Sequence, residues 1–242
     1  MKLEGVQKSW EKLGETDPIS AMLPADLRGR ISGLEEFFAS GQREIDDLMK
    51  YVTSLGINLE RKKALDFGCG LGRCSQALAG YFDEVYGVDI ASSMIELANK
   101  YNRDSNKCRY LVNQTNDLQI FENNSVDFVW SYGVLHLVEP HYFRDYIKEF
   151  LRVLVPGGLA VFHQSAEPAE TWKGAIFRVT PTTLLNFYRR AKYGFEVHGM
   201  RREQVLELLD QTGGTVLDVH EDRRTPGPNW RGFQYCVLKN PK

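Results

Sequence analysis

Short apolar runs alternate with helix-like segments through the middle of this 242-residue chain. Strand patterns cover residues 63–67, 84–89, 109–113, 125–131 and 159–163. Helical patterns occupy the intervals between them, at residues 74–81, 92–101 and 143–154. Alternation of this kind is typical of a parallel sheet whose right-handed crossover connections place helices on both faces. The sequence therefore predicts an α/β fold with its core at residues 61–163.

Three further regions surround this core. Residues 1–60 hold a helical pattern that begins at Leu34 and is interrupted at Ser40–Gly41, so we expect an N-terminal helical cap. Residues 164–200 have little periodicity and form a predicted insertion after the fifth strand. Residues 201–242 contain a terminal helix followed by two strand patterns. The length suits one domain that comprises all of these regions.

The composition argues against several classes of partner. A net charge of −2 and a pI near 6.2 give no overall field that would favour nucleic acid or an anionic membrane. No apolar run approaches the roughly 20 residues of a membrane span, and the first residues lack the apolar core of a signal peptide. Four cysteines without paired metal-ligand spacing indicate reduced thiols. We therefore expect a cytoplasmic protein with no metal, no membrane partner and little affinity for nucleic acid.

A glycine-rich turn follows the first strand, where residues 64–72 have the sequence ALDFGCGLG. In α/β sheets, ligands bind at the carboxyl ends of the strands, and glycines let them approach the backbone. A nicotinamide-dependent oxidoreductase is disfavoured, because its G-x-G-x-x-G spacing differs from the G-x-G-x-G that ends here at Gly72. Asp66 before the first glycine suits a cationic group, and Asp89 after the second strand can accept hydrogen bonds from ribose hydroxyls. Together they indicate a nucleoside that carries an amino acid.

Four segments, in this order, resemble motifs of the class I S-adenosylmethionine-dependent methyltransferases. They are ALDFGCGLGR, VYGVDIASSMIELA, LVNQTNDLQIFENNSVDFVWSYGVLHLV and RVLVPGGLAVF. The resemblance implies a Rossmann-like sheet of seven strands that is mostly parallel and has an antiparallel last strand. It also implies S-adenosylmethionine as the cofactor and methyl transfer to a nucleophile as the reaction.

The same resemblance implies contacts with the cofactor at positions spread over these segments. The positions are Asp66, Gly68, Gly70, Asp89, Ile90, Met94, Asn116, Asp117, Leu118 and Ser131. Asp66 would reach the ammonium group through backbone or water, and Asp89 would hold the ribose. Residues 116–118 would meet the adenine, with Gln114 and Thr115 as alternatives. Ser131 would lie near the methyl donor.

A histidine is the best candidate for a catalytic base. His136 lies in SYGVLHLV after the fourth strand, in the loop expected to face the cofactor, where related enzymes often carry a histidine. A base there could take the proton of a hydroxyl or phenol nucleophile. A structural role for His136 stays open, since a neutral histidine can simply hydrogen-bond backbone. Tyr132 is a second candidate, as a wall of the site or a proton partner.

The predicted insertion is rich in aromatic and basic residues, including Trp172 and Arg178. Such a set could clamp a flat or anionic small molecule. We expect the acceptor to lie under the insertion and the N-terminal helix, in the space between His136, Trp172 and Arg178. A solvated basic face over a local aromatic core is the alternative. Methylation of a protein or RNA, and a sensor that binds S-adenosylmethionine without turnover, also stay open.

Overall fold

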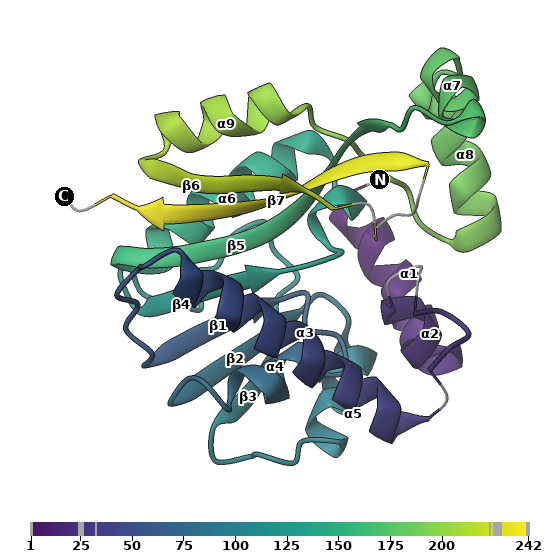
Figure 1. The fold of residues 1–242 in the computed structure, drawn as a ribbon. Coiled ribbons are helices and arrows are strands. Elements are labelled where there is room, and N and C mark those ends of the chain that lie inside the picture. The colour runs from purple at the N-terminus through teal and green to yellow at the C-terminus, as the bar shows by residue number, and fades with distance from the viewer. Residues whose placement is uncertain (1, 24–26, 32, 223, 225–228, 241–242) are drawn as a thin grey trace.

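A seven-stranded sheet lies at the centre of the computed structural model, which describes residues 2–23, 27–31, 33–222, 224 and 229–240 (Figure 1). The strands are β1 (Lys63–Phe67), β2 (Glu84–Asp89), β3 (Cys108–Val112), β4 (Val126–Ser131), β5 (Leu154–Pro168), β6 (Gly214–Glu221) and β7 (Trp230–Lys239). Their order is β3-β2-β1-β4-β5-β7-β6, and β7 runs antiparallel to both of its neighbours. The predicted fold class is therefore confirmed.

Helices cover both faces of this sheet. One face packs against α3 (Leu34–Ser54), α4 (Arg73–Leu78) and α5 (Ser92–Lys100). The other packs against α6 (Pro140–Val153) and α9 (Arg202–Gln211). The fully buried strand β4 serves both cores, because alternate side chains point to opposite faces. Phe128 and Trp130 belong to the first core, and Val129 belongs to the second.

The strand order creates a crevice at one edge of the sheet. From β1 the chain moves outward through β2 to β3, and it then returns to β4 on the other side of β1. The connections that leave β1 and β4 therefore diverge to opposite faces, and the carboxyl ends of these strands border the crevice. This is the place where α/β sheets of this kind bind ligands.

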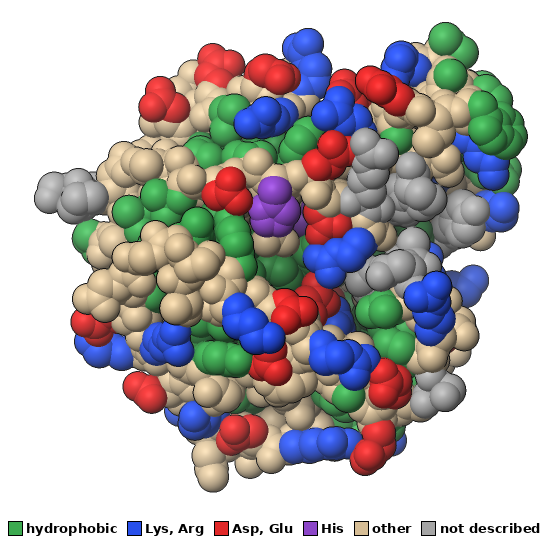
Figure 2. Space-filling model, viewed as in Figure 1, with side chains coloured by type: hydrophobic (Ala, Val, Ile, Leu, Met, Phe, Trp, Pro, Cys, Tyr) green, Lys and Arg blue, Asp and Glu red, His purple; other side chains and the backbone are tan. Residues whose placement is uncertain are grey.

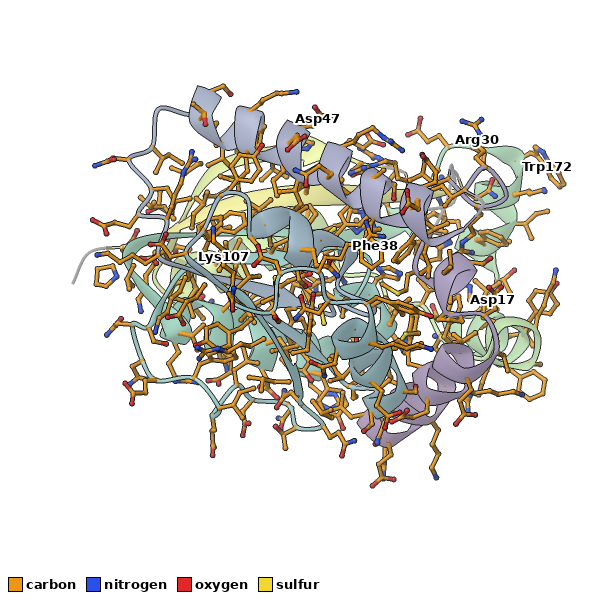
Figure 3. All side chains as sticks on the ribbon, turned by 90° about the horizontal axis from the view of Figure 1, so that it is seen from below. Asp17, Arg30, Phe38, Asp47, Lys107 and Trp172 are labelled. Atoms are coloured by element: carbon orange, nitrogen blue, oxygen red, sulfur yellow. The ribbon has the colours of Figure 1, made fainter. Side chains whose placement is uncertain are left out.

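Helix α3 is continuous, so the predicted interruption at Ser40–Gly41 is wrong. Gly41 marks a close approach between helices. A Cβ atom at this position would lie 2.4 Å from the carbonyl oxygen of Arg73 at the start of α4. The rest of α3 is amphipathic, with Phe38 turned toward the protein and Asp47 toward solvent (Figure 3). Tight contact between α3 and α4 thus explains a glycine that looked like a helix break.

Two N-terminal helices, α1 (Leu3–Thr16) and α2 (Pro18–Met22), lie next to the carboxyl edge of the sheet (Figure 1). The carboxylate of Glu11 on α1 accepts hydrogen bonds from the backbone N–H groups of Ser92 (2.7 Å) and Ser93 (2.9 Å). These groups belong to the first turn of α5, where backbone donors have no partner within the helix. Glu11 therefore anchors α1 over the edge of the sheet.

The predicted insertion contains two helices, which its irregular pattern did not indicate. They are α7 (Trp172–Val179) and α8 (Thr182–Tyr193), and they project beyond the end of the sheet (Figure 1). Strand β5 also runs past the expected end at His163 to Pro168, because β7 pairs with it along that length. Figure 2 shows acidic and basic side chains interspersed over the face in view. Among the described helices, none combines the length and apolar character needed to cross a membrane.

Replacement of Gly41 by Ala tests the contact between α3 and α4. Alanine favours a helix by about 1 kcal/mol over glycine, but its methyl group would press on the Arg73 backbone. Because overpacking costs about 1–3 kcal/mol, we expect a net loss of unfolding free energy of about 1–2 kcal/mol in urea denaturation. The exposed Asp47→Ala variant of the same helix is the control and should change stability by less than about 0.5 kcal/mol. A Gly41→Ala protein as stable as wild type would show that α3 can move away.

Candidate functional site

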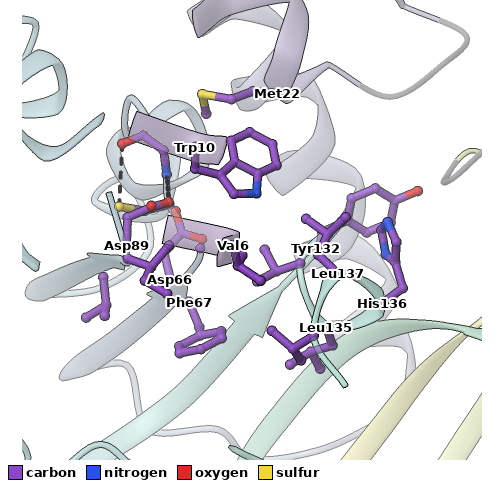
Figure 4. Close-up of a pocket in the computed structure, with 18 of the residues that line it drawn as sticks. Val6, Trp10, Met22, Asp66, Phe67, Asp89, Tyr132, Leu135, His136 and Leu137 are labelled. Carbon is purple, nitrogen blue, oxygen red and sulfur yellow. Dashed lines mark hydrogen bonds between the residues drawn. The ribbon is translucent and has the colours of Figure 1, made fainter. Parts of the chain in front are cut away.

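A pocket occupies the crevice at the carboxyl ends of β1, β2 and β4 (Figure 4). Asp66 and Asp89 lie at one end of it, and Tyr132 and His136 lie at the other. Trp10 of α1 and other residues of the N-terminal helices cover it from above. Of the positions predicted from the sequence, the pocket brings together Asp66, Gly68, Gly70, Asp89, Ile90, Tyr132 and His136.

The glycine turn approaches other parts of the chain at both of its predicted contact points. A Cβ atom at Gly68 would lie 2.0 Å from Val134, and one at Gly70 would lie 2.1 Å from the side-chain end of Met22. The sulfur of Met22 also accepts the backbone N–H of Leu71 at 3.3 Å. Both glycines have positive φ angles, which non-glycine residues rarely adopt. A ligand lying against Gly70 must therefore share or displace the flexible side chain of Met22.

Asp89 connects the second strand to the glycine turn. Its Oδ2 accepts the backbone N–H of Gly70 at 3.0 Å, and its Oδ1 accepts that of Ala91 at 2.9 Å. Burial raises the pKa of Asp89, and these hydrogen bonds partly offset the rise. A carboxylate oxygen can accept more than one hydrogen bond, so both oxygens retain capacity for the hydroxyl groups of a ribose.

Asp66 lies deeper, at the end of β1. It is buried, and the hydroxyl of Ser75 donates a hydrogen bond of 2.6 Å to its Oδ2. Burial raises the pKa of Asp66 to about 7, against the lowering effects of Ser75 and the positive charge of Arg73. A cation bound near Asp66 would favour the ionised form, which makes this end of the pocket suitable for an ammonium group.

The end of β3 presents a different residue from those expected. Asn113 lines the pocket, and its side-chain amide donates to the backbone oxygens of Thr115 (3.2 Å) and Asp117 (2.8 Å). Residues 116–118 do not line the pocket. The side-chain amide of Asn116 donates a hydrogen bond to Asp145 on α6, and the Leu118 side chain is buried. The residue that the end of β3 contributes to the pocket is thus Asn113, which the sequence pattern did not single out although it directly follows β3.

Two other predicted positions lie in the protein interior. Met94 is fully buried in the core that α3 forms with Leu71, and it does not line the pocket. Ser131, the last residue of β4, is also fully buried and does not line the pocket. Their roles toward a cofactor would therefore be indirect, through packing.

Tyr132 is held on three sides. Its hydroxyl donates to Asp222 Oδ2 at 3.1 Å, and its ring stacks on Trp130 at a centroid distance of 5.7 Å. The guanidinium carbon of Arg224 lies over the Tyr132 ring, 4.7 Å from its centroid, and Arg224 pairs with Asp222 at 2.7 Å. Burial raises the pKa of the phenol further above its ordinary value. Tyr132 is therefore a neutral wall of the pocket whose proton is committed to Asp222.

His136 lies in the short 3-10 helix η1 (Leu135–Leu137) that follows β4. It is buried, and its Nδ1 has no hydrogen-bond partner among the described residues. Burial, reinforced by His163 and His198, lowers the pKa of His136 to about 3. The ring is therefore neutral near pH 7, and one of its nitrogens can accept a hydrogen bond from a bound molecule.

Of the three residues expected around the acceptor, only His136 lines the pocket. Trp172 is 72% exposed on the outer side of α7, and neither it nor Arg178 lines the pocket. The insertion contributes Phe195 instead, from the segment after α8. The remaining cover comes from α1, α2 and Leu23, which no motif marked as part of a site. Only the amphipathic pattern of α1 could have suggested that it covers something.

The same architecture and sequence pattern occur in known proteins. Residues 65–162 match the family model described as a methyltransferase domain. A demethylmenaquinone methyltransferase from Staphylococcus saprophyticus is 32% identical over 110 residues, which are 44% of this chain and 46% of that protein. A tRNA N(3)-methylcytidine methyltransferase from Drosophila melanogaster is 27% identical over 186 residues, or 73% of this chain and 56% of that protein. The matches span only about half the length of these curated relatives.

A solved structure shares the fold over nearly the whole chain. It is magnesium protoporphyrin IX methyltransferase from Synechocystis PCC 6803 with bound S-adenosylhomocysteine. The TM-score is 0.65 over 97% of this chain and 98% of that one, at 16% sequence identity. At such identity the likeness concerns the fold alone, and the residues of the pocket must be judged from their own geometry.

Replacement of Asp89 by Ala should weaken binding of S-adenosylhomocysteine by about 1–3 kcal/mol, the scale of lost hydrogen bonds to a buried charged group. The measurement is titration calorimetry at constant pH. Asp83→Ala is the matched control: this exposed residue directly precedes β2, at the end of the strand opposite to Asp89, and the variant should bind as wild type does. Equal affinities for Asp89→Ala and wild type would contradict the ribose assignment.

The raised pKa of Asp66 predicts a pH-dependent stability. The folded state keeps this group protonated up to about pH 7, whereas the unfolded chain releases the proton near its ordinary pKa of about 4. Unfolding free energy should therefore fall as pH rises through that window and stay low above it. Urea denaturation of ligand-free wild type and of Asp66→Asn isolates the effect. Between about pH 4 and pH 7 the unfolding free energy of wild type should fall by about 2–4 kcal/mol more than that of the variant. Parallel pH profiles for the two proteins would show that Asp66 ionises normally.

Proposed function

We propose that this chain is a class I S-adenosylmethionine-dependent methyltransferase that transfers the methyl group of S-adenosylmethionine to a small, largely apolar molecule. One observation carries the proposal. Beyond its acidic end, the pocket is lined mainly by apolar side chains, and several of them belong to the N-terminal helix α1. These side chains are Leu3, Val6, Trp10, Leu135, Leu137, Val138 and Phe195. Such a lining suits an acceptor that is buried on binding.

Residues at the acidic end would hold the cofactor, which when bound supplies an already activated methyl group. Asp89 would accept the ribose hydroxyls, and Ile90 and Asn113 would border the adenine. Asp66 would face the ammonium group, whose charge favours its ionised form. The Met22 side chain over Gly70 would close this end and exclude water. These residues bind and orient, which is most of what a protein must contribute to transfer from an activated donor.

His136 would orient the acceptor. Because its pKa is lowered to about 3, His136 is a weak base at neutral pH. It would therefore accept a hydrogen bond from a hydroxyl or amine of the acceptor rather than remove the proton completely. Tyr132 would shape the wall beside it, since its own proton is committed to Asp222. The nucleophile would therefore be a group that reacts without a strong base, such as an amine, an enol or an acidic phenol.

Small-molecule and RNA acceptors can be separated directly. The protein is incubated with methyl-labelled S-adenosylmethionine and either an organic-solvent extract of cells or total tRNA. The Staphylococcus saprophyticus relative, a demethylmenaquinone methyltransferase, favours the first substrate, and the Drosophila melanogaster relative, a tRNA methyltransferase, favours the second. We expect label in an organic-soluble product. Label in tRNA would overturn the proposed acceptor. Binding of S-adenosylmethionine without transfer to either fraction would also overturn it, and would leave a protein acceptor or a sensor.

Replacement of His136 by Ala should reduce kcat roughly 10- to 100-fold with the extract that supports turnover, because one oriented buried hydrogen bond is worth about 1–3 kcal/mol. Affinity for S-adenosylhomocysteine should change far less, since the cofactor residues lie at the other end of the pocket. His141→Ala, an exposed histidine on α6, is the matched control and should keep full activity. An unchanged kcat for His136→Ala would assign this residue a structural role.

A further inference from the structure

The outer faces of α7 and α8 expose large apolar side chains. On α7 these are Trp172 (72% exposed), Ile176 (50%) and Val179 (82%). On α8 they are Leu184 (59%), Phe187 (69%) and Tyr188 (55%). The spacings, i, i+4, i+7 on α7 and i, i+3, i+4 on α8, each define one face of a helix. We call these six residues the apolar hairpin face, and Figure 2 shows hydrophobic side chains gathered where α7 and α8 project.

The inner sides of both helices are already packed. A Cβ atom at Gly174 would lie 1.9 Å from the carbonyl oxygen of Ala169, so α7 rests directly on the backbone that follows β5. The guanidinium of Arg189 on α8 is buried, 4.9 Å from the Trp230 ring centroid, and donates to Asn186 at 2.9 Å. Helices α7 and α8 are thus held with the apolar hairpin face outward, and Figure 3 shows Trp172 of this face pointing away from the protein.

The charge of this region differs from that of the whole chain. Residues 171–194 contain no Asp or Glu, and their basic residues are Lys173, Arg178, Arg189, Arg190 and Lys192. Lys173 lies 5.2 Å from the Trp172 ring centroid, and Lys192 lies 5.6 Å from that of Tyr188. Positive charge therefore adjoins the exposed aromatic rings. Arg189 is buried and Arg190 pairs with Glu196, so the exposed positive charge comes from Lys173, Arg178 and Lys192. The net charge of −2 for the whole chain conceals this local group.

We propose that the apolar hairpin face docks the protein onto the surface of an anionic phospholipid bilayer. Exposed Trp, Phe and aliphatic side chains beside Lys and Arg are the combination by which helices lie in a membrane interface. A second copy of the chain fits less well, because two such faces would bring like charges together. RNA would use the basic and aromatic groups but would leave Ile176, Val179 and Leu184 without a partner. Docking of this kind needs no membrane-spanning helix.

The hairpin also connects to the cover of the pocket. Gly194, which ends α8, accepts a hydrogen bond from the hydroxyl of Ser9 on α1. The next residue, Phe195, lines the pocket. A bilayer bound by the apolar hairpin face would therefore lie beside the N-terminal cover, where an apolar acceptor could pass from lipid to pocket. This last consequence, unlike the docking itself, rests on the proposed function.

Sedimentation with vesicles tests the docking. Wild-type protein is mixed with vesicles of phosphatidylcholine alone or of phosphatidylcholine with phosphatidylglycerol. We expect binding to the anionic vesicles about tenfold or more above that to the neutral ones, and weaker binding at high salt. Trp172→Ser combined with Phe187→Ser should abolish binding to both. Lys173→Gln combined with Arg178→Gln and Lys192→Gln should remove the preference for anionic lipid.

The controls separate docking from folding and from catalysis. Ile120→Ser combined with Leu217→Ser removes exposed apolar residues elsewhere (49% and 38% exposed) and should bind vesicles as wild type does. All variants should retain wild-type helicity and affinity for S-adenosylhomocysteine. Failure of wild type to sediment with anionic vesicles would overturn the proposal, as would a dimer that the Trp172 and Phe187 changes dissociate, or stronger binding to RNA than to lipid. If wild type does not bind S-adenosylhomocysteine but does sediment with anionic vesicles, the proposed function would be overturned and the proposed membrane docking would stand.

Discussion

The hydrogen bonds accepted by Asp89 are the constraint on which the site depends. One carboxylate oxygen holds the backbone of Gly70 in the turn after β1, and the other holds Ala91 at the start of α5. The connections that leave the neighbouring strands β1 and β2 are thereby fixed relative to each other beside the pocket. Asp89 is partly buried, and the loss of solvent raises the pKa of its carboxyl group. A ligand that donates further hydrogen bonds to this group offsets part of that desolvation.

The N-terminal helices complete a pocket that the sheet alone leaves open. Glu11 ties α1 to the first turn of α5, and Met22 of α2 rests on Gly70 and Leu71. The first contact pairs a charged group with unsatisfied backbone donors and fixes position. The second involves only the end of a flexible thioether side chain, which can move at low cost. The cover therefore has a fixed part over α5 and an adjustable part over the glycine turn.

Burial decides the protonation of the groups at the acceptor end. His136 and His163 are both buried, and burial lowers the pKa of each, to about 3 and about 4. Their rings lie 6.1 Å apart, so protonation of one would also oppose that of the other. Tyr132 is kept neutral by the same burial and by its bond to Asp222. His136 and Tyr132 thus present neutral hydrogen-bonding groups to the pocket, which supports the proposed apolar acceptor.

The sequence by itself determined the sheet, the glycine turn and the placing of Asp66 and Asp89 at strand ends. Such features depend on local periodicity and on steric limits of single residues, which are visible along the chain. Contacts between distant segments were decided only by the tertiary structure. It made Gly41 a point of contact with Arg73, brought Asn113 to the pocket in place of residues 116–118, and turned Trp172 toward solvent. Which face of a helix is covered depends on the neighbour that packs against it, and no local pattern identifies that neighbour.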